Sequence, residues 1–337
     1  MSDVKYVYAD CAASSPPLKC AVDAFTKWAY ANPNSAHSLG RDARGDLEYA
    51  RETIAFIINA KPEQIAFTPS ATSACRTALS YLNIADCSPY EHKAVTEAVG
   101  WNRMFLCGDE HSTAHMLANN ETGERYDFIV RDLSKDNVVF CDATAAVGQI
   151  PVDVKWLGVH ALAAGAHKFG GLPGIGFLYL RDGITDEATF PGTPPVALAV
   201  AMANALEYRG LHMTEANIYL MEQTERLAKS IMEIPGASIN TPFKGRLSNI
   251  LSVRFDGVNA RELLTMLDVN SVYASAGSAC ADDSDEPSPV LLASGLTEEQ
   301  ALSTIRLSFC PETTEEEFNF LSEALSRCVT QLRQSTK

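Results

Sequence analysis

The chain has 337 residues, of which 46% are hydrophobic, so it can bury one large core and a smaller second one. A disordered chain is therefore excluded. The formal net charge of −15 and the pI of about 4.9 exclude broad binding to a nucleic-acid backbone or an anionic membrane, while basic protein partners fit this charge.

The cysteines and the N-terminus bear on the cellular compartment. Nine cysteines, an odd number, form no C-x-x-C pair and no zinc-like spacing, which favours reduced thiols in a cytosol. Residues 1–10 contain no signal-peptide pattern, and no run of about 18 apolar residues occurs. We therefore expect a cytoplasmic protein that does not span a membrane.

The first predicted elements are a helix, a strand and a second helix. Apolar residues recur at helical spacing over residues 41–60. A short strand follows at Ile65 to Thr68, and after Pro69 and Ser70 a helix is predicted from about Ala71 to Leu82. The backbone N–H groups near Thr72, at the start of this helix, form a candidate anion site.

Three further strands, at Val138 to Asp142, His160 to Ala164 and Gly174 to Leu180, end in polar or glycine-rich loops. Strands alternating with amphipathic helices predict a mostly parallel sheet covered on both faces. In such a sheet ligands bind outside the carboxyl ends of the strands, so these loops are the expected place for chemistry.

The composition changes after about Arg209. Long helices are predicted at Met213 to Met232 and Glu315 to Leu332, with strands at Asn249 to Phe255 and Thr304 to Leu307 between them. We interpret this part as a smaller C-terminal α/β domain.

The predicted domains are a large one over residues 16–209 and a small one formed by residues 1–15 and 210–337. Two capping boxes support helix starts in the small domain, because each places a hydroxyl and an acceptor three residues apart. They are Thr297 with Gln300 and Thr313 with Glu316.

Lys168 and Asp142 are the most informative pair. Lys168 stands among small residues after an apolar strand, where its amine can become a nucleophile toward an aldehyde. Asp142 ends another strand, where a carboxylate can keep a pyridine nitrogen protonated. Alone, the two have ordinary interpretations as a surface lysine and a helix cap. Together they are the groups that pyridoxal 5′-phosphate (PLP) requires.

Three further residues are candidates. The imidazole of His92 could stack on a pyridine ring and pass protons, and Asn120 could donate to a phenolic oxygen or a substrate carboxylate. Their ordinary interpretations are a surface or core histidine and a turn residue. Cys280 follows small residues and precedes four acids, which predicts an exposed loop over about residues 274–288. A thiol on such a loop can attack a substrate and carry the product elsewhere.

In this order the motifs resemble those of the cysteine desulfurases of the class V aminotransferase group, in particular the branch that serves iron–sulfur assembly. The chain resembles a divergent and shortened member of this branch. The resemblance covers nearly the whole chain. It rests on Tyr8 to Ala13, Asn32 to His37 with Gly40, Phe67 to Thr72, Glu91 to Lys93, Asn119 to Glu121, Asp142 to Thr144, His167 with Lys168, Gly192 to Pro194, Gly277 to Cys280, and Ile305 to Ser308.

The resemblance implies a fold type I PLP-dependent transferase, with a mostly parallel seven-stranded sheet in the large domain and a small α/β C-terminal domain. It implies that Lys168 binds PLP and removes the substrate α-proton, that His92 stacks on the ring and that Asp142 pairs with its nitrogen. The implied phosphate ligands are Ala71, Thr72 and His167, with Thr193 reaching from the second subunit of a homodimer.

For the substrate, the resemblance implies that Asn34, Asn120 and Arg306 bind the carboxylate of L-cysteine, since a guanidinium can do so with two parallel hydrogen bonds. Cys280 would then attack the substrate sulfur, which leaves a persulfide on the enzyme and releases L-alanine. The sulfur would pass to an acceptor protein for iron–sulfur cluster, thio-cofactor or tRNA synthesis. The acids that follow Cys280 suggest a basic acceptor.

Five departures from the family pattern point to weaker or partner-dependent activity. Each removes a polar or charged group, or a glycine, near the expected cofactor, and a lost neutral hydrogen bond costs about 0.5–1.5 kcal/mol. PLP binding is therefore expected to persist. The departures are Ala145, Gly165, Ser70, Ser73 and Phe190.

Other interpretations stay open. A different fold type I lyase or aminotransferase, or a selenocysteine lyase, would share the PLP residues, and a degenerate scaffold would retain them without activity. A nicotinamide dehydrogenase is disfavoured because no G-x-G-x-x-G follows a first strand. His111 and His115 have the spacing of helical metal ligands, but Ser112 stands where a metalloprotease has its general base, so a solvated segment is favoured.

Overall fold

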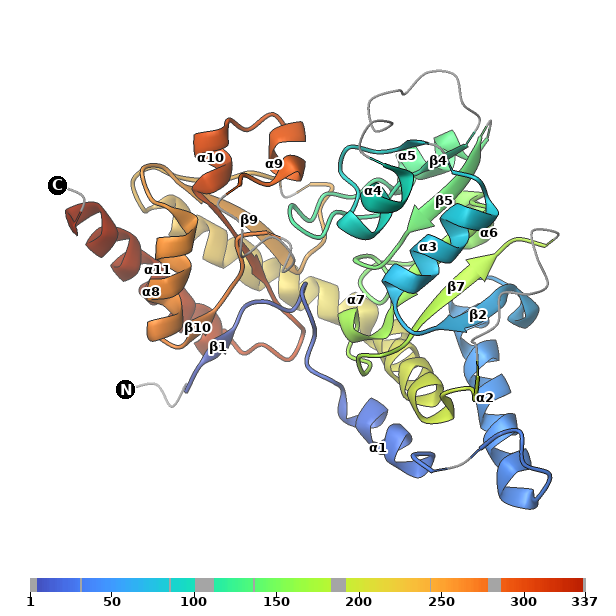
Figure 1. Cartoon of the computed structure of the whole chain (residues 1–337). Coiled ribbons are helices and arrows are strands. Elements are labelled where there is room, and N and C mark those ends of the chain that lie inside the picture. The colour runs from blue at the N-terminus through green and yellow to red at the C-terminus, as the bar shows by residue number, and fades with distance from the viewer. Residues whose placement is uncertain are drawn as a thin grey trace. The chain divides into compact units, whose positions relative to one another are not determined.

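The structure is a computed structural model that describes residues 5–30, 32–84, 86–100, 112–135, 137–182, 192–242, 244–277 and 286–335. The chain divides into two compact units (Figure 1). The large unit consists of Ser15–Ala118 and Tyr126–Met213. The small unit consists of Met1–Ser14, Asn119–Arg125 and Thr214–Lys337.

The large unit is built on one mixed sheet with the strand order β2-β7-β6-β5-β4-β3 (Figure 1). Strands β3 to β6 are parallel neighbours, while β7 runs antiparallel to both β6 and β2. The prediction of a mostly parallel sheet is confirmed, and the described residues supply six strands where seven were expected. The strands are β2 (Ile65–Thr68), β3 (Asp86–Cys87), β4 (Ser112–Ala114), β5 (Val138–Asp142), β6 (Ala161–Gly165) and β7 (Gly176–Leu180).

Helix α3 packs on one face of this sheet through a core of small and aliphatic side chains. Ala74, Ala78 and Leu79 of α3 are buried with Phe140 of β5 and Leu178 of β7. The other helices of the large unit include one of 37 residues that continues into the small unit. The helices are α1 (Lys19–Lys27), α2 (Ser38–Ile57), η1 (Pro62–Gln64), α3 (Ala71–Tyr81), α4 (Lys93–Val99), α5 (Asp127–Leu133), α6 (Val154–Leu157), η3 (Ala166–Lys168) and α7 (Val196–Met232).

The small unit contains an antiparallel sheet in the order β11-β9-β8 and a parallel pair of strands, β1 and β10. Its core is formed by aliphatic and aromatic side chains of β9, β11, α8 and α11. The elements are β1 (Val7–Tyr8), β8 (Ala237–Ile239), β9 (Ile250–Phe255), α8 (Ala260–Val269), β10 (Val272–Tyr273), α9 (Pro289–Ala293), α10 (Glu298–Leu302), β11 (Thr304–Ser308) and α11 (Glu315–Ser335).

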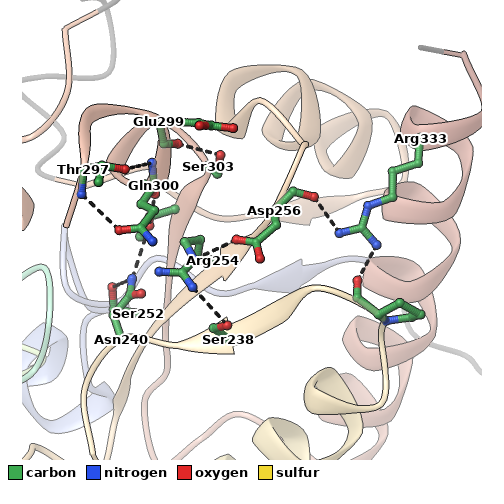
Figure 2. Close-up of polar contacts among 12 residues, drawn as sticks. Ser238, Asn240, Ser252, Arg254, Asp256, Thr297, Glu299, Gln300, Ser303 and Arg333 are labelled. Atoms are coloured by element: carbon green, nitrogen blue, oxygen red, sulfur yellow. Dashed lines mark hydrogen bonds and ion pairs between the residues drawn. The ribbon is translucent and has the colours of Figure 1, made fainter. Parts of the chain in front are cut away.

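A network of side-chain hydrogen bonds stabilises the β8–β9 edge and the start of α10 (Figure 2). Arg254 donates to the carboxylate of Asp256 at 2.9 Å and to the hydroxyl of Ser238 at 3.2 Å. The predicted capping box of Thr297 with Gln300 is confirmed, because each side chain accepts the other's backbone N–H.

The second predicted capping box is wrong by one residue. Thr314 and Glu317, rather than Thr313 and Glu316, exchange the side-chain and backbone hydrogen bonds. The reason is that the hydroxyl of Thr313 accepts the backbone N–H of Cys310 instead.

Among the described residues, no helix has both the length and the apolar character that crossing a membrane requires.

Candidate active site

Lys168 and Asp142 lie at the same edge of the large-unit sheet. Strands β5 and β6 are parallel neighbours, with Asp142 paired with Ala163, so their carboxyl ends meet at one edge. Asp142 is the last residue of β5, and Lys168 lies in η3, which begins directly after β6. The hydroxyl of Ser15 donates to the backbone carbonyl of Lys168 at 3.1 Å and helps to hold this turn.

The carboxylate of Asp142 is buried and has few protein donors. Its Oδ1 atom accepts the backbone N–H of Thr144 at 2.9 Å. The thiol of Cys75, on α3, lies 3.9 Å from Oδ2 and is a weak donor. Because a buried carboxylate needs strong hydrogen bonds or a cation, Oδ2 is suited to a protonated ring nitrogen.

His92 caps the N-terminus of α4 and lies within the electrostatic reach of both Asp142 and Lys168. Its Nδ1 atom accepts the backbone N–H of Ala94 at 3.1 Å, so the neutral ring carries its proton on Nε2. Burial lowers the pKa of His92, Lys168 lowers it further, and the charge of Asp142 opposes both. The imidazole is therefore neutral at neutral pH.

Glu91 is a functional candidate that the sequence analysis missed as an individual residue. Its carboxyl group is buried, Oε1 accepts the backbone N–H of Met116 at 2.5 Å, and Oε2 has no hydrogen-bond partner in the part of the chain that the structure describes. Burial, and next the charge of Asp142, raise the pKa of Glu91 well above its ordinary value. Glu91 therefore holds a proton more tightly than a solvated carboxyl group does.

The N-terminus of α3 is open to an anion. The hydroxyl of Ser70 accepts the N–H of Ser73 at 3.1 Å, while the N–H groups of Ala71 and Thr72 belong to the first turn, which has no intrahelical acceptors. Gly176 lies against this turn, since a Cβ atom there would come within 2.9 Å of the nitrogen of Ala71. A glycine at this position leaves the backbone groups uncovered.

His167 and Gly165 lie beside the same turn. A Cβ atom at Gly165 would lie 3.3 Å from the Cβ of Ala71 and 3.5 Å from the imidazole of His167. Burial, and next the charge of Lys168, lower the pKa of His167 to about 4. A neutral imidazole there could donate one hydrogen bond to a phosphate.

Two predicted residues of the large unit are exposed. Asn34 lies in the turn before α2, where its backbone N–H donates to the side chain of Asn32 at 2.9 Å. Thr193 lies in the turn before α7.

Arg306 and Asn120 come together in the small unit. Arg306 is buried on β11, where Nη2 donates to the carboxylate of Asp10 at 2.6 Å and Nη1 donates to the backbone carbonyl of Asn120 at 3.0 Å. The Nε–H group of Arg306 has no acceptor among the described residues. A buried guanidinium with an unused donor is suited to bind a small carboxylate.

Cys280, the predicted nucleophile, and Phe190 lie outside the described residues. The two flanks of the segment 278–285 are described, and both contact Glu121. The hydroxyl of Ser288 donates to Oε2 of Glu121 at 2.6 Å, and a Cβ atom at Gly277 would lie 3.2 Å from the same oxygen. Glu121, which the sequence analysis did not single out, therefore contacts residues on both sides of this segment.

A metal site finds no support in the described residues, where no cluster of three potential ligands occurs. Burial lowers the pKa of His115, and its ring packs edge-on against Tyr126. His111 lies outside the described residues.

A parallel sheet edge that presents a lysine, a buried aspartate and a bare helix N-terminus defines the class of PLP-dependent enzymes. The chain belongs to the aminotransferase class-V family, whose sequence pattern matches residues 7–110 and 109–321. Members of this family depend on PLP, and PLP is the cofactor of this chain.

Known proteins that resemble the chain support its assignment to this family. A cysteine desulfurase IscS of Dictyoglomus turgidum is 32% identical, over 97% of this chain and 95% of its own length. A solved NifS-like protein superposes with a TM-score of 0.87 at 27% identity, covering 97% of this chain and all of its own. A structure described as SspA in complex with cysteine has a TM-score of 0.74 at 26% identity, covering 91% of this chain and all of its own.

The positions of these groups in the large unit fit the phosphate, the ring nitrogen and the aldehyde of PLP. The uncovered N–H groups at Ala71 and Thr72 could hold the phosphate, and the under-donated Oδ2 of Asp142 could hold the ring nitrogen. Lys168 stands at the same sheet edge, where its amine could bond to the aldehyde.

Proposed function

We propose that the chain is a PLP-dependent cysteine desulfurase, which converts L-cysteine to L-alanine and holds the sulfur as a persulfide on Cys280. The observation that carries this proposal is the convergence of Lys168, Asp142 and neutral His92 at one edge of the sheet. The relatives named as cysteine desulfurases support the choice of reaction among class V enzymes.

When bound, PLP supplies an electron sink for the bonds of the substrate α-carbon. Asp142 would hold the ring nitrogen, and the neutral imidazole of His92 would stack on the ring. The amine of Lys168 would bind the cofactor and serve as the base for the substrate α-proton. Ala71, Thr72 and His167 would bind the phosphate.

In the small unit, Arg306 binds the substrate carboxylate, and Asp10 and the carbonyl of Asn120 orient its guanidinium. Asn34 and the side chain of Asn120 add contacts to the substrate. The thiolate of Cys280 would attack the sulfur of L-cysteine and form the S–S bond of a persulfide, while the bond from that sulfur to Cβ breaks. The electron pair of the broken bond stays with the three-carbon fragment, which takes up a proton at Cβ and leaves as L-alanine. We propose that a sulfur-acceptor protein, matched in charge to the acids after Cys280, then removes this sulfur for iron–sulfur cluster assembly.

The domain and assembly predictions belong to the same proposal. Residues 16–209 form the PLP-binding domain, and residues 1–15 and 210–337 form the domain that carries the Cys280 loop. The chain acts as a homodimer in the cytoplasm, and Thr193 binds the phosphate of the second subunit. The exposure of Thr193 before α7 supports this arrangement.

The departures from the family pattern bear on activity. Gly165 contributes no hydroxyl to the phosphate, and a side chain there would meet the Cβ of Ala71 at 3.3 Å. Ala145 contributes no amide to the cofactor's phenolic oxygen. Because each lost hydrogen bond costs about 0.5–1.5 kcal/mol, we expect weakened rather than abolished PLP binding.

The decisive experiment incubates PLP-loaded protein with L-cysteine and a thiol reductant and measures alanine and sulfide together. We expect equal amounts of both products, loss of both in the Lys168→Ala variant, and loss of persulfide in the Cys280→Ser variant. Cys20→Ser is the matched control, because Cys20 is a half-buried thiol of α1 whose hydrogen bond goes to Asn204.

Each alternative has its own outcome. Sulfide formation that persists in Cys280→Ser identifies another class V reaction in which this thiol is incidental. A purified protein that stays colourless with added PLP identifies a scaffold without catalytic function. Both results contradict the proposal.

A further inference from the structure

Cys75 of helix α3 contacts the carboxylate of Asp142 within the large unit. Its sulfur lies 3.9 Å from Oδ2, although the two residues are 67 positions apart in the chain. Both are buried, with 1% of Cys75 and 6% of Asp142 exposed. Cys75 lies one helical turn after Ala71, whose N–H belongs to the proposed phosphate site. The same helix therefore supplies donors for the phosphate and a contact to the residue that would hold the ring nitrogen.

Cys141, the residue before Asp142 on β5, provides a contrast. Successive side chains of a strand point to opposite faces of the sheet. Phe140 and Asp142 share the face that packs against α3, since Phe140 is buried with residues of that helix and Asp142 contacts Cys75. Cys141 is completely buried on the other face. Two buried thiols thus lie near Asp142, and a hydrogen bond joins the one on α3 to its carboxylate.

The two oxygens of Asp142 have donors of different strength. Oδ1 accepts the backbone N–H of Thr144 at 2.9 Å, whereas Oδ2 has the thiol of Cys75 as its donor. A thiol is a weak donor, so it orients an acceptor while withdrawing little of its negative charge. Burial, and next the charge of Asp142, raise the pKa of Cys75 well above its ordinary value, so the sulfur retains the proton that it donates. Oδ2 therefore keeps its capacity to accept from a second, stronger donor.

We propose that Cys75 is a positioning residue for PLP, whose thiol fixes the orientation of the Asp142 carboxylate and leaves Oδ2 able to accept from the ring nitrogen. The contact between the two buried groups carries the proposal. It rests on the role of Asp142 in the proposed function, but it does not depend on the reaction with L-cysteine. Without a donor at position 75, the carboxylate would be free to turn away from the ring.

Two substitutions remove the contact in different ways. A hydroxyl hydrogen bond requires about 2.7–2.8 Å between its oxygens, and the C–O bond of serine is shorter than the C–S bond of cysteine. The hydroxyl of Cys75→Ser therefore does not reach Oδ2, and we expect it to donate to the carbonyl of Ala71, four residues earlier in the helix. Cys75→Ala removes the donor altogether. Cys141→Ser is the matched control, because it alters a buried thiol next to Asp142 on the other face of the sheet.

The first measurement titrates each apoprotein with PLP and follows the nitrogen NMR resonance of PLP labelled at the ring nitrogen as the pH is changed. We expect both Cys75 variants to bind PLP about three- to tenfold more weakly than wild type, as the loss of one hydrogen bond predicts. The ring nitrogen should lose its proton about 0.5–1 pH unit lower in these variants, and at the wild-type pH in Cys141→Ser. An unchanged ring-nitrogen titration in both Cys75 variants overturns the proposal even where PLP binds more weakly, because a purely structural role would weaken binding alone.

The second measurement tests the contact without PLP. The S–H stretching band of a thiol moves to lower frequency when the thiol donates a hydrogen bond, so the infrared spectrum of the apoprotein reports on Cys75 directly. We expect a shifted band that Cys75→Ser lacks and Cys141→Ser retains. Asp142→Asn gives the same test if the Cys75 variants do not fold: the band should move toward the frequency of a free thiol, because an amide oxygen is a weaker acceptor than a carboxylate. Identical S–H bands in wild type and Asp142→Asn overturn the proposal.

Both measurements separate this inference from the proposed reaction, because neither uses L-cysteine. A protein whose ring nitrogen depends on Cys75 as expected, but which forms no alanine from L-cysteine, supports the positioning role and contradicts the desulfurase. A protein that forms alanine, and whose ring nitrogen titrates identically in wild type and both Cys75 variants, contradicts the positioning role and leaves the desulfurase intact.

Discussion

The guanidinium of Arg306 donates to the carboxylate of Asp10 at 2.6 Å, with 2% of the arginine side chain and 21% of the aspartate side chain exposed. The pair joins the N-terminal segment of the small unit to β11, the strand at one end of its three-stranded sheet. Such a buried charge depends on its partner, because removing one member leaves the other desolvated and uncompensated.

The Asp10→Ala variant is therefore expected to lose about 3 kcal/mol of folding free energy, measured by urea unfolding, while Asp10→Asn loses less because it keeps an acceptor. The control is Glu315→Ala, which breaks an exposed ion pair with Arg226 and should cost at most about 1 kcal/mol. Equal losses in Asp10→Ala and Glu315→Ala would contradict a stabilising role for the buried pair.

Acid should destabilise the protein through its buried histidines. The pKa values of His92, His115 and His167 all lie below the ordinary value of 6.5, mainly because of burial, and that of His167 lies at about 4. Below pH 6.5 the unfolded chain binds more protons than the folded one. The stability that these neutral rings provide is therefore complete above pH 6.5 and lost as the pH falls toward 4.

The comparison of wild type with His167→Gln isolates one of these rings. His167 accounts for at most about 3 kcal/mol of the loss, reduced by its partial exposure. Urea midpoints at pH 7 and pH 4.5 measure the difference, and the variant should lose less stability than wild type over this interval. An identical loss in both proteins would assign the acid sensitivity to other groups.

Glu91 should have the opposite pH dependence. Its raised pKa means that the folded protein retains a proton that the unfolded chain releases above about pH 4.5. The stability linked to this group is lost as the pH rises, by up to about 1.4 kcal/mol per pH unit. Glu91→Gln removes the titration and still accepts the N–H of Met116, so we expect a flatter stability profile between pH 5 and pH 8.

Glu91→Ala provides the control for this experiment. It also lacks the titrating group, but it leaves the buried N–H of Met116 without its acceptor. The pH profile should be equally flat and lie about 1–3 kcal/mol lower at all pH values. A Glu91→Gln profile as steep as that of wild type would show that Glu91 is ionised in the folded protein.

The helices and strands whose bounds depend on the local sequence pattern could be predicted closely from the sequence. Strands β2 and β5 have the predicted bounds, because their apolar runs end at a proline turn and at Asp142. Helix α2 begins three residues earlier than predicted, since the imidazole of His37 accepts the N–H of Gly40 and caps the helix. It ends earlier than predicted because Asn59, just beyond it, has a positive φ of 58°.

The candidate site likewise contains some features that the sequence pattern predicts and others that it does not. The common edge of Asp142 and Lys168 follows from parallel strands, which a sequence pattern reveals. The contact of Asp10 with Arg306 joins distant parts of the chain, and no local periodicity encodes it. Glu91 could not be singled out, because the burial of one carboxyl group depends on tertiary packing.

Gly176 provides a test of the anion site at the start of α3. A Cβ atom there would lie 2.6 Å from the carbonyl oxygen of Ala164 and 2.9 Å from the nitrogen of Ala71, both of them backbone atoms. Gly176→Ala should therefore shift the first turn of α3, cost about 1–3 kcal/mol of stability and weaken PLP binding about tenfold or more.

Gly45→Ala is the matched control for Gly176→Ala. Gly45 lies inside α2, and a Cβ atom there would have no neighbour within 4 Å. This variant should gain about 0.5–1 kcal/mol from helix propensity and bind PLP like wild type. PLP affinity in Gly176→Ala equal to that in Gly45→Ala would remove the helix N-terminus from the phosphate site.

The last prediction concerns the contact between Ser288 and Glu121, which lie next to the segment that contains Cys280. The hydroxyl of Ser288 donates to the carboxylate of Glu121 at 2.6 Å and also accepts the N–H of Leu291 at the start of α9. A hydrogen bond to a charged group contributes about 1.5–3 kcal/mol. Ser288→Ala should therefore release the α9 end of this segment.

Under the proposed function, Cys280 must reach the substrate sulfur, so we expect that releasing one end of its segment lowers the fraction of time in which the thiol is in position. We expect Ser288→Ala to form the Cys280 persulfide about tenfold more slowly, in proportion to a loss of about 1.4 kcal/mol, while L-cysteine still changes the absorption of bound PLP. Ser294→Ala, at the other end of α9, removes only a neutral hydrogen bond to the carbonyl of Val290 and should keep the wild-type rate. Equal persulfide rates in Ser288→Ala and wild type would mean that Glu121 acts on the fold of the small unit and leaves the position of Cys280 unaffected.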